Sequence, residues 1–219
     1  MILKTQELFD LEWTVAKPLL KKCEYPHEAL PKIGSFIKEE IIPLLDESYK
    51  EISEGVYVAD DAKIWDGVTI VGPTVIGHSA EIRPGAFIRG NAIIGNGAVI
   101  GNSTEVKNAI VFDGAQLPHY NYVGDSIIGY KAHMGAGAIA SNLRLDKKEI
   151  VLKSEDEKMH SGLKKIGVFL GDHAEVGCGS VLCPGSIIGK EAMVYPLTTV
   201  IGTVPEHTIY DGKCFKEKV

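Results

Sequence analysis

An aliphatic residue recurs at every sixth position in the middle of this chain, and this spacing constrains the fold more than any other feature. The first run covers Val58, Ile64, Ile70, Ile76, Ile82, Ile88, Ile94, Ile100 and Val106. A second run covers Leu170, Val176, Leu182, Ile188, Val194 and Val200. Neither a helix, with a period of about 3.6, nor a half-buried strand, with a period of about 2, gives this spacing. A period of six indicates short strands that each turn one aliphatic side chain inward before a corner, as in a hexapeptide β-helix.

Small or branched residues keep the same period four positions after the aliphatic ones, as at Ala80, Ala86 and Ala92. We expect the large side chains to stack inside the coils and the small ones to fill the corners. A β-sandwich is the alternative, but its strands recur at about 8–12 residues with variable turns. The repeat therefore predicts an all-β fold. It resembles the left-handed parallel β-helix, which has about 18 residues per coil.

Composition narrows the class of protein. The chain has 219 residues, is 45% hydrophobic and carries a net charge of −6, which suits one soluble domain with a small appendage. It has no long basic run, so we expect no nucleic-acid partner. We also expect no membrane partner, because no stretch approaches ~20 apolar residues and the start does not resemble a signal peptide. Four cysteines without a CxxC pair favour reduced thiols and a cytoplasmic location.

Segments outside the repeat divide the chain into three parts. Residues 1–54 show helical spacing and prolines, and we expect them to form a small N-terminal helical cap on the open edge of the first coil. Residues 55–205 form the β-helix, with a long loop at about 142–168, where the ladder stops. The ladder also falters between Phe112 and Ile128, which are sixteen residues apart. Residues 206–219 are expected to form a C-terminal tail.

A motif begins near the first of these breaks. It reads Glu105-Val-Lys107, then His119-Tyr-Asn-Tyr122-Val-Gly124-Asp125, then Gly135-Ala136-Gly137 and Asn142. The motif resembles the acetyltransferase domain of the bifunctional glucosamine-1-phosphate acetyltransferase/N-acetylglucosamine-1-phosphate uridyltransferases, and looks closest to their archaeal-type sugar-1-phosphate branch. The resemblance covers roughly residues 55–205, and we expect no nucleotidyltransferase domain, because residues 1–54 carry no Gly-rich nucleotide loop.

The resemblance implies a role for each matching residue. His119 matches the catalytic histidine, and an imidazole is the natural base for taking a proton from an amine near neutral pH. Arg89 and Lys107 match residues that bind a sugar phosphate, to which they would offer a planar fork and a point charge. Other positions match substrate contacts: Glu105, which would orient Lys107 or contact the sugar, Tyr122, Asn142 and Lys148.

The donor site is also implied by the resemblance, with acetyl-CoA as co-substrate. Backbone amides near Ala136 and Ala138 match contacts to the acyl thioester and the pantetheine arm. Three positions depart from the bacterial pattern and would still line this site: His133, where those enzymes have Asn, Cys178, where they have Ser, and Pro196, where they have Ala. No metal is expected.

Together these features predict a cytoplasmic homotrimer that acetylates the amine of glucosamine 1-phosphate or galactosamine 1-phosphate, in UDP-N-acetylglucosamine or related sugar-nucleotide biosynthesis. A separate nucleotidyltransferase is a further candidate partner. Three alternatives remain open. One is a β-helix that binds a sugar nucleotide or scaffolds a partner without catalysis. The second is a γ-type carbonic anhydrase, which needs three histidine zinc ligands. The third is O-acetyl transfer, which would not need the phosphate site.

Overall fold

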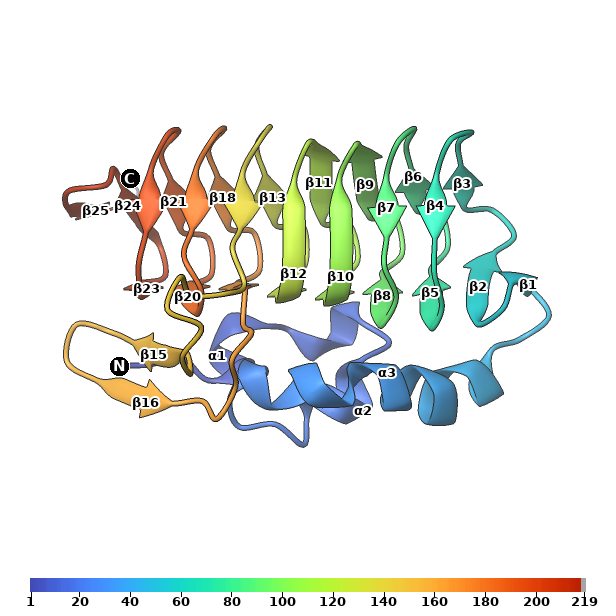
Figure 1. Cartoon of the computed structure of the whole chain (residues 1–219), viewed down its shortest axis with the longest axis horizontal. Helices are drawn as coiled ribbons and strands as arrows, with labels where there is room; N and C mark the ends of the chain where they lie inside the picture. The colour runs from blue at the N-terminus through green and yellow to red at the C-terminus, as the bar shows by residue number, and fades with distance from the viewer. Residues whose placement is uncertain (218–219) are drawn as a thin grey trace.

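The computed structural model describes residues 1–217, and it shows a parallel β-helix whose coils stack along one axis (Figure 1). Each coil contributes one short strand to each of three faces. Face 1 contains β2 (Val56–Ala59), β5 (Thr74–Ile76), β8 (Ala92–Ile94), the second halves of β10 (Glu105–Val111) and β12 (Tyr122–Ile128), β17 (Val168–Leu170), β20 (Ser186–Ile188) and β23 (Thr203–Val204). All of these strands pair in parallel.

The other two faces complete each coil. Face 2 contains β3 (Lys63–Ile64), β6 (Glu81–Ile82), β9 (Val99–Asn102), β11 (Gln116–His119), β13 (His133–Met134), β18 (Glu175–Val176), β21 (Met193–Val194) and β24 (Thr208–Tyr210). Face 3 contains β4 (Thr69–Ile70), β7 (Phe87–Ile88), the first halves of β10 and β12, β14 (Ile139–Ala140), β19 (Val181–Leu182) and β22 (Thr199–Val200). The predicted β-helix is therefore confirmed.

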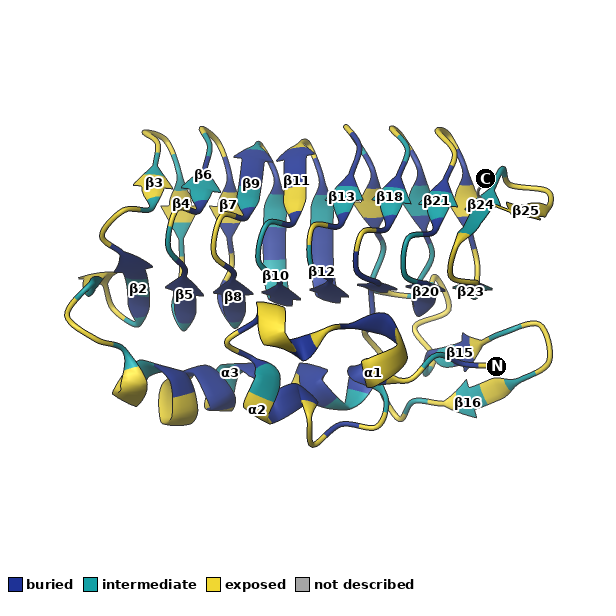
Figure 2. Cartoon of the chain, turned by 180° about the vertical axis from the view of Figure 1, so that it is seen from behind, coloured by how far each residue is buried: buried dark blue, intermediate teal, exposed yellow. Residues whose placement is uncertain are grey.

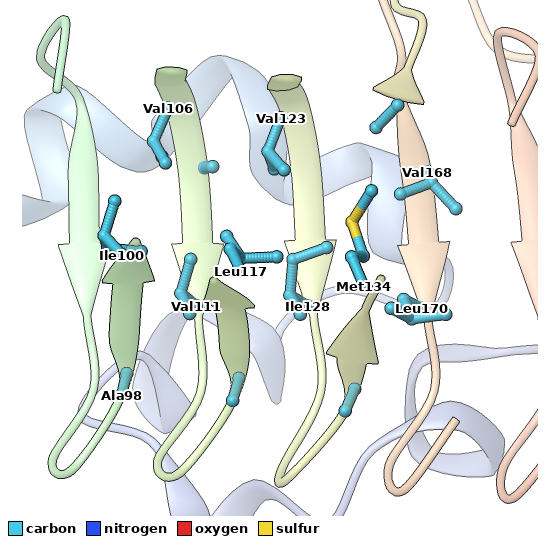
Figure 3. Close-up of a cluster of buried hydrophobic side chains, with 14 of the residues drawn as sticks. Ala98, Ile100, Val106, Val111, Leu117, Val123, Ile128, Met134, Val168 and Leu170 are labelled. Atoms are coloured by element: carbon cyan, nitrogen blue, oxygen red, sulfur yellow. The ribbon is translucent and has the colours of Figure 1, made fainter. Parts of the chain in front are cut away.

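The aliphatic ladder fills the interior, as the period of six predicts, and it continues between Phe112 and Ile128, where the sequence predicts that the repeat falters. Figure 3 shows Ile100, Val106, Val111, Leu117, Val123, Ile128 and Met134 stacked inside the coils, and all are fully buried. Two steps, from Val106 to Val111 and from Val123 to Ile128, contain five residues instead of six. Asn108 and Asp125 turn these two corners with positive φ angles of 47° and 50°, and the equivalent six-residue step from Ile88 to Ile94 has Gly90 in addition to Asn91, whose φ is 49°.

The second interruption is a loop ejected from one coil, as predicted. The ladder continues from Ala140 in β14 to Leu170 in β17, whose strand pairs with β12 beside it. The loop between them folds into the hairpin of β15 (Val151–Lys153) and β16 (Lys158–His160). Its apolar side chains Ile150, Leu152 and Ile166 are buried, so the loop packs as part of the fold.

The helices of the N-terminal segment do not cap the first coil, contrary to the expectation. Its short helices lie along face 1 (Figures 1 and 2). They are α1 (Thr5–Leu8), η1 (Leu11–Trp13), α2 (Lys17–Leu20), η2 (Pro26–Lys32), α3 (Ile33–Phe36), η3 (Ile37–Ile41) and η4 (Ile42–Leu44). Their apolar side chains form one core with outward-pointing residues of face 1, including Val75, Ile93 and Phe169. Face 1 carries enough outward-pointing apolar surface to require a covering layer. The edge of the first coil is paired with β1 (Tyr49–Ser53), which runs antiparallel to β2.

The C-terminal end also differs from the expected tail. Residues Thr208–Tyr210 form β24, which continues face 2 beside β21, and β25 (Phe215–Glu217) folds back on it as an antiparallel strand. The β-helix therefore extends beyond residue 205, while residues 218–219 of the predicted tail lie outside the described part. Among residues 1–217, no helix is both long enough and apolar enough to span a bilayer.

Candidate functional site

Two corners of the β-helix collect most of the predicted site residues. The corner between faces 3 and 1, here called the phosphate edge, carries Arg89 and Lys107. The two are stacked because Ile88 pairs with Val106 in the next coil, and the Arg89 backbone N–H donates to the Val106 carbonyl at 2.8 Å. The predicted stacking of the two cations is therefore confirmed.

Glu105 binds Arg89 and not Lys107, which corrects the first of its two predicted roles, to orient Lys107, and leaves the predicted contact with the sugar as a prediction. Arg89 Nη1 and Glu105 Oε1 are 2.6 Å apart, and this bond raises the pKa of the guanidinium. Lys107 forms no ion pair with another residue in the described range 1–217. Its ammonium group is thus available to an anionic ligand, while Arg89 is oriented by a carboxylate partner.

Tyr122 and Asn142 meet beside the phosphate edge. The Tyr122 hydroxyl is hydrogen-bonded to the Asn142 side chain, and burial, followed by the nearby Glu105 carboxylate, raises the pKa of the phenol. Gly124 allows this approach, because a Cβ at that position would lie 2.6 Å from the Tyr122 hydroxyl and 2.7 Å from Asn142 Nδ2. The structure therefore brings together Tyr122 and Asn142 at the edge that carries the two cations.

A polar ladder that the sequence reasoning missed supports this edge. Asp125 is buried, and its two carboxylate oxygens accept hydrogen bonds from Asn108 Nδ2 at 2.8 Å and from Asn142 Nδ2 at 2.6 Å. The three residues belong to successive coils. The signal was present in the sequence, since Asn91, Asn108, Asp125 and Asn142 follow one another at intervals of 17 residues. Charge-assisted hydrogen bonds of this kind fix the position of Asn142.

His119 lies at the other end of face 3. It ends β11 at the corner between faces 2 and 3, here called the histidine edge, and its side chain is exposed. Its backbone is held on both sides: the N–H donates to Asn121 Oδ1 at 3.1 Å and the carbonyl accepts from Gly137 N–H at 3.0 Å. Buried Asn121 in turn donates to the Gly135 carbonyl at 2.8 Å. The imidazole is therefore a solvent-accessible group on a fixed backbone.

The histidine edge also carries a pocket of about 320 Å³ that contains three of the predicted donor-site residues, His133, Cys178 and Pro196. His133 Nδ1 lies 2.8 Å from Glu175 Oε2, a contact that joins two neighbouring coils of face 2. Ala136 is exposed at this edge, and its carbonyl accepts from Gly179 N–H at 2.8 Å. Three of these four residues therefore line one pocket, and Ala136 lies at the same edge in the coil next to that of His119.

Two predicted residues do not join these groups. Ala138 is fully buried in the interior of the coil, and its N–H donates to the Gly135 carbonyl, so neither its side chain nor its amide is free for a ligand. Its position follows from the repeat, which places a small residue at each corner. Lys148 is exposed in the ejected loop, where its backbone N–H donates to Asp146 Oδ1 at 3.2 Å. The structure shows no contact between Lys148 and the phosphate edge in the described residues.

Fold and site together define the class of this protein, a hexapeptide-repeat β-helix with an exposed histidine at one corner and a cationic edge at the next. A family model described as the GMPPB C-terminal domain matches residues 70–204, more than half of the chain. The chain belongs to this family.

Curated relatives confirm the resemblance expected from the motif. The bifunctional sugar-1-phosphate nucleotidylyltransferase/acetyltransferase of Sulfurisphaera tokodaii is 36% identical over 170 residues, 78% of this chain and 41% of the relative. The bifunctional protein GlmU of Methanococcus maripaludis (strain C5) is 34% identical over 91 residues, 42% of this chain and 22% of the relative. The chain therefore spans less than half the length of these relatives. The uncharacterized acetyltransferase YaiX of Escherichia coli K12 is 31% identical over 173 residues, 78% of this chain and 75% of the relative.

Solved structures resemble the chain more distantly. PerB from Caulobacter crescentus, in complex with CoA and GDP-perosamine, has 19% identity and a TM-score of 0.36, and the match covers 68% of this chain and 57% of PerB.

Proposed function

We propose that this chain is an acetyl-CoA-dependent N-acetyltransferase that acts on the amine of an amino-sugar 1-phosphate. The observation that carries the proposal is the arrangement of one exposed histidine and two stacked cations at the two ends of face 3. His119 and Tyr122 are three residues apart on one coil, about 10 Å in an extended chain. Lys107 lies in register with Gly124, five residues after His119, so in this proposal the acceptor lies along face 3 with its amine toward the imidazole and its phosphate toward the phosphate edge.

The roles follow from the chemistry of each group. Lys107 offers a point charge and Arg89 a planar fork to the phosphate, while Tyr122 and Asn142 offer hydrogen bonds to the sugar hydroxyls. His119 accepts a proton from the amine as the amine nitrogen attacks the thioester carbonyl. The C–N bond forms and the C–S bond breaks, and His119 returns the proton to the departing CoA thiolate. No covalent acyl-enzyme is needed.

The pocket on the histidine edge is proposed to hold the donor. Its lining residues His133, Cys178 and Pro196 lie one to three coils from His119, and the exposed Ala136 connects them to it. A groove with apolar walls suits the pantetheine arm of acetyl-CoA. The acetyltransferase activity in the name of the Sulfurisphaera relative supports this choice of reaction.

Assembly and context belong to the same proposal. Face 3 exposes apolar side chains, including Phe87 and Ile139, each 38% exposed. We propose that a neighbouring copy covers this face in a homotrimer, so that each site forms between two chains. The proposed location is the cytoplasm and the proposed context is sugar-nucleotide biosynthesis, including UDP-N-acetylglucosamine biosynthesis with a separate nucleotidyltransferase. The family match gives the carbonic anhydrase alternative no support.

The test is release of free CoA thiol from acetyl-CoA with a panel of acceptors. Glucosamine 1-phosphate and galactosamine 1-phosphate are the positive candidates. Glucosamine without a phosphate and glucose 1-phosphate without an amine are the matched controls. We expect turnover only when the acceptor has both groups. Turnover with neither amino-sugar phosphate contradicts the proposal, and equal turnover with glucosamine contradicts the phosphate edge.

A further inference from the structure

A second pocket lies directly beyond the phosphate edge, and the proposed acetyl transfer does not use it. Its volume is about 320 Å³, and it lies between the N-terminal layer, the corner of the β-helix and the end of the ejected loop. Six residues that line it matter here: Leu30, Asn108, Asp125, Leu163, Lys164 and Lys165. Asn108 directly follows Lys107 in sequence, so the pocket lies next to the phosphate edge.

Two residues of the polar ladder, Asn108 and Asp125, form the polar part of the pocket, here called its floor. Asp125 is only 6% exposed and binds both Asn108 and Asn142. Each carboxylate oxygen has a further lone pair, and Asn108 has an amide carbonyl, so the floor can accept hydrogen bonds from a ligand. Asn142 also contacts Tyr122. Asn142 therefore joins the proposed sugar site to Asp125, which lines the second pocket.

The walls of the pocket combine apolar and cationic side chains. Leu30 comes from η2 and Leu163 from the loop, and they offer an apolar surface. Lys164 and Lys165 are exposed at the rim, and neither forms an ion pair with any residue in the range 1–217. Backbone contacts fix this end of the loop, because Lys165 bridges to Leu143 and Ile166 N–H donates to the Asn142 carbonyl at 3.1 Å.

This combination suits the rest of a nucleotide. Paired ammonium groups at the rim match a second phosphate, because lysine binds phosphate as a point charge. An apolar wall above hydrogen-bond acceptors matches a planar base that carries N–H donors. A bare sugar 1-phosphate would occupy only the phosphate edge and leave this pocket empty.

We propose that the pocket binds the second phosphate and the nucleoside of a nucleoside-diphosphate-linked amino sugar, which is then the preferred acceptor. The inference rests on the proposed acetyl transfer, and it extends the acceptor beyond the phosphate edge. The ejected loop is the element that provides this selectivity, since it supplies Leu163, Lys164 and Lys165.

The experiment compares each amino-sugar 1-phosphate that is acetylated with its UDP and GDP derivatives. The variant is Lys164→Ala/Lys165→Ala. The charge-matched control is Lys158→Ala/Lys213→Ala, at two exposed lysines that do not line the pocket. Circular dichroism verifies that both variants remain folded. In parallel, calorimetry measures the binding of UDP and of GDP to the wild type and to both variants.

We expect the wild type to have a KM about tenfold lower for a nucleotide-linked amino sugar than for the 1-phosphate. The pocket variant should lose this advantage without a change in the KM for the 1-phosphate, and the control should retain it. Equal KM values for the two acceptors in the wild type overturn the inference but leave the proposed function intact. An equal rise in KM for both acceptors in the pocket variant has the same consequence. If no acceptor is acetylated, the proposed function fails. Binding of UDP or GDP that the pocket variant loses then still supports the pocket, and absence of binding overturns it.

Discussion

Replacement of Gly124 by alanine is expected to weaken acceptor binding, because the new methyl group would enter the contact between Tyr122 and Asn142. It would lie 2.6 Å from the Tyr122 hydroxyl and 2.7 Å from Asn142 Nδ2, whereas nonbonded atoms prefer about 3.5–4.0 Å. Both side chains must therefore move by roughly 1 Å. Gly124 is not among the described glycines with positive φ, so alanine is compatible with the backbone there.

The expected rise in KM follows from the loss of one hydrogen bond between the acceptor and Tyr122 or Asn142. A neutral hydrogen bond contributes ~1 kcal/mol, so the KM for the amino-sugar phosphate should rise about fivefold. Overpacking should also lower the free energy of unfolding by about 1–3 kcal/mol. Steady-state thiol release measures the first effect, and urea unfolding followed by circular dichroism measures the second.

The matched control is Tyr122→Phe, alone and combined with Gly124→Ala. Phenylalanine removes the hydroxyl with which the new methyl group would collide, so the two changes in KM should be less than additive. A Gly124→Ala variant with reduced stability and an unchanged KM would refute the reasoning, because Tyr122 and Asn142 would then move without any effect on the acceptor.

Three further predictions concern other parts of the molecule. Lys107→Ala should raise the KM for the acceptor about tenfold with little change in kcat, and an unchanged KM in thiol release would exclude it from the phosphate site. Burial lowers the pKa of His27. Below about pH 6.5 the unfolded chain therefore takes up a proton that the folded chain does not bind, so the free energy of unfolding should decrease as the pH falls through this value. His27→Phe should flatten that dependence in urea unfolding, and exposed His160→Ala should not. Phe169→Ala should cost about 3–5 kcal/mol of unfolding free energy, and a loss under ~1 kcal/mol would contradict the packing of the N-terminal layer on face 1.

The scaffold could be predicted because one aliphatic residue per hexapeptide is required by the interior of the coil, and this requirement repeats. The five-residue steps at Asn108 and Asp125 escaped prediction, since a shorter corner shifts the ladder by one position and imitates a break. The position of the N-terminal segment was predictable in principle. Apolar pairs such as Val75-Ile76 and Ile93-Ile94 recur on face 1, and the first member of each pair points outward and needs a cover.

Only some of the site residues could be predicted, because the repeat fixes a position in space only for residues that belong to it. Arg89 and Lys107 occupy fixed positions on the repeat, so their spacing alone places them at one edge, and Tyr122 pairs with Glu105 two residues before that edge. Ala138 was assigned to a ligand although the repeat places it inside. Lys148 lies in the ejected loop, where no period relates sequence to position. Asp125 was quoted only as part of a motif, because its role depends on two amide partners from neighbouring coils.

The proposed chemistry depends on one proton acceptor, and His119→Ala tests it most directly. The measurement is kcat for thiol release with the best amino-sugar phosphate at saturating acetyl-CoA, together with the KM for the acceptor. Loss of the base should lower kcat by about 10²–10⁴-fold and leave the KM nearly unchanged, since Arg89, Lys107, Tyr122 and Asn142 remain in place. A kcat equal to that of the wild type in a folded His119→Ala variant would contradict the proposed role of the histidine edge in acetyl transfer.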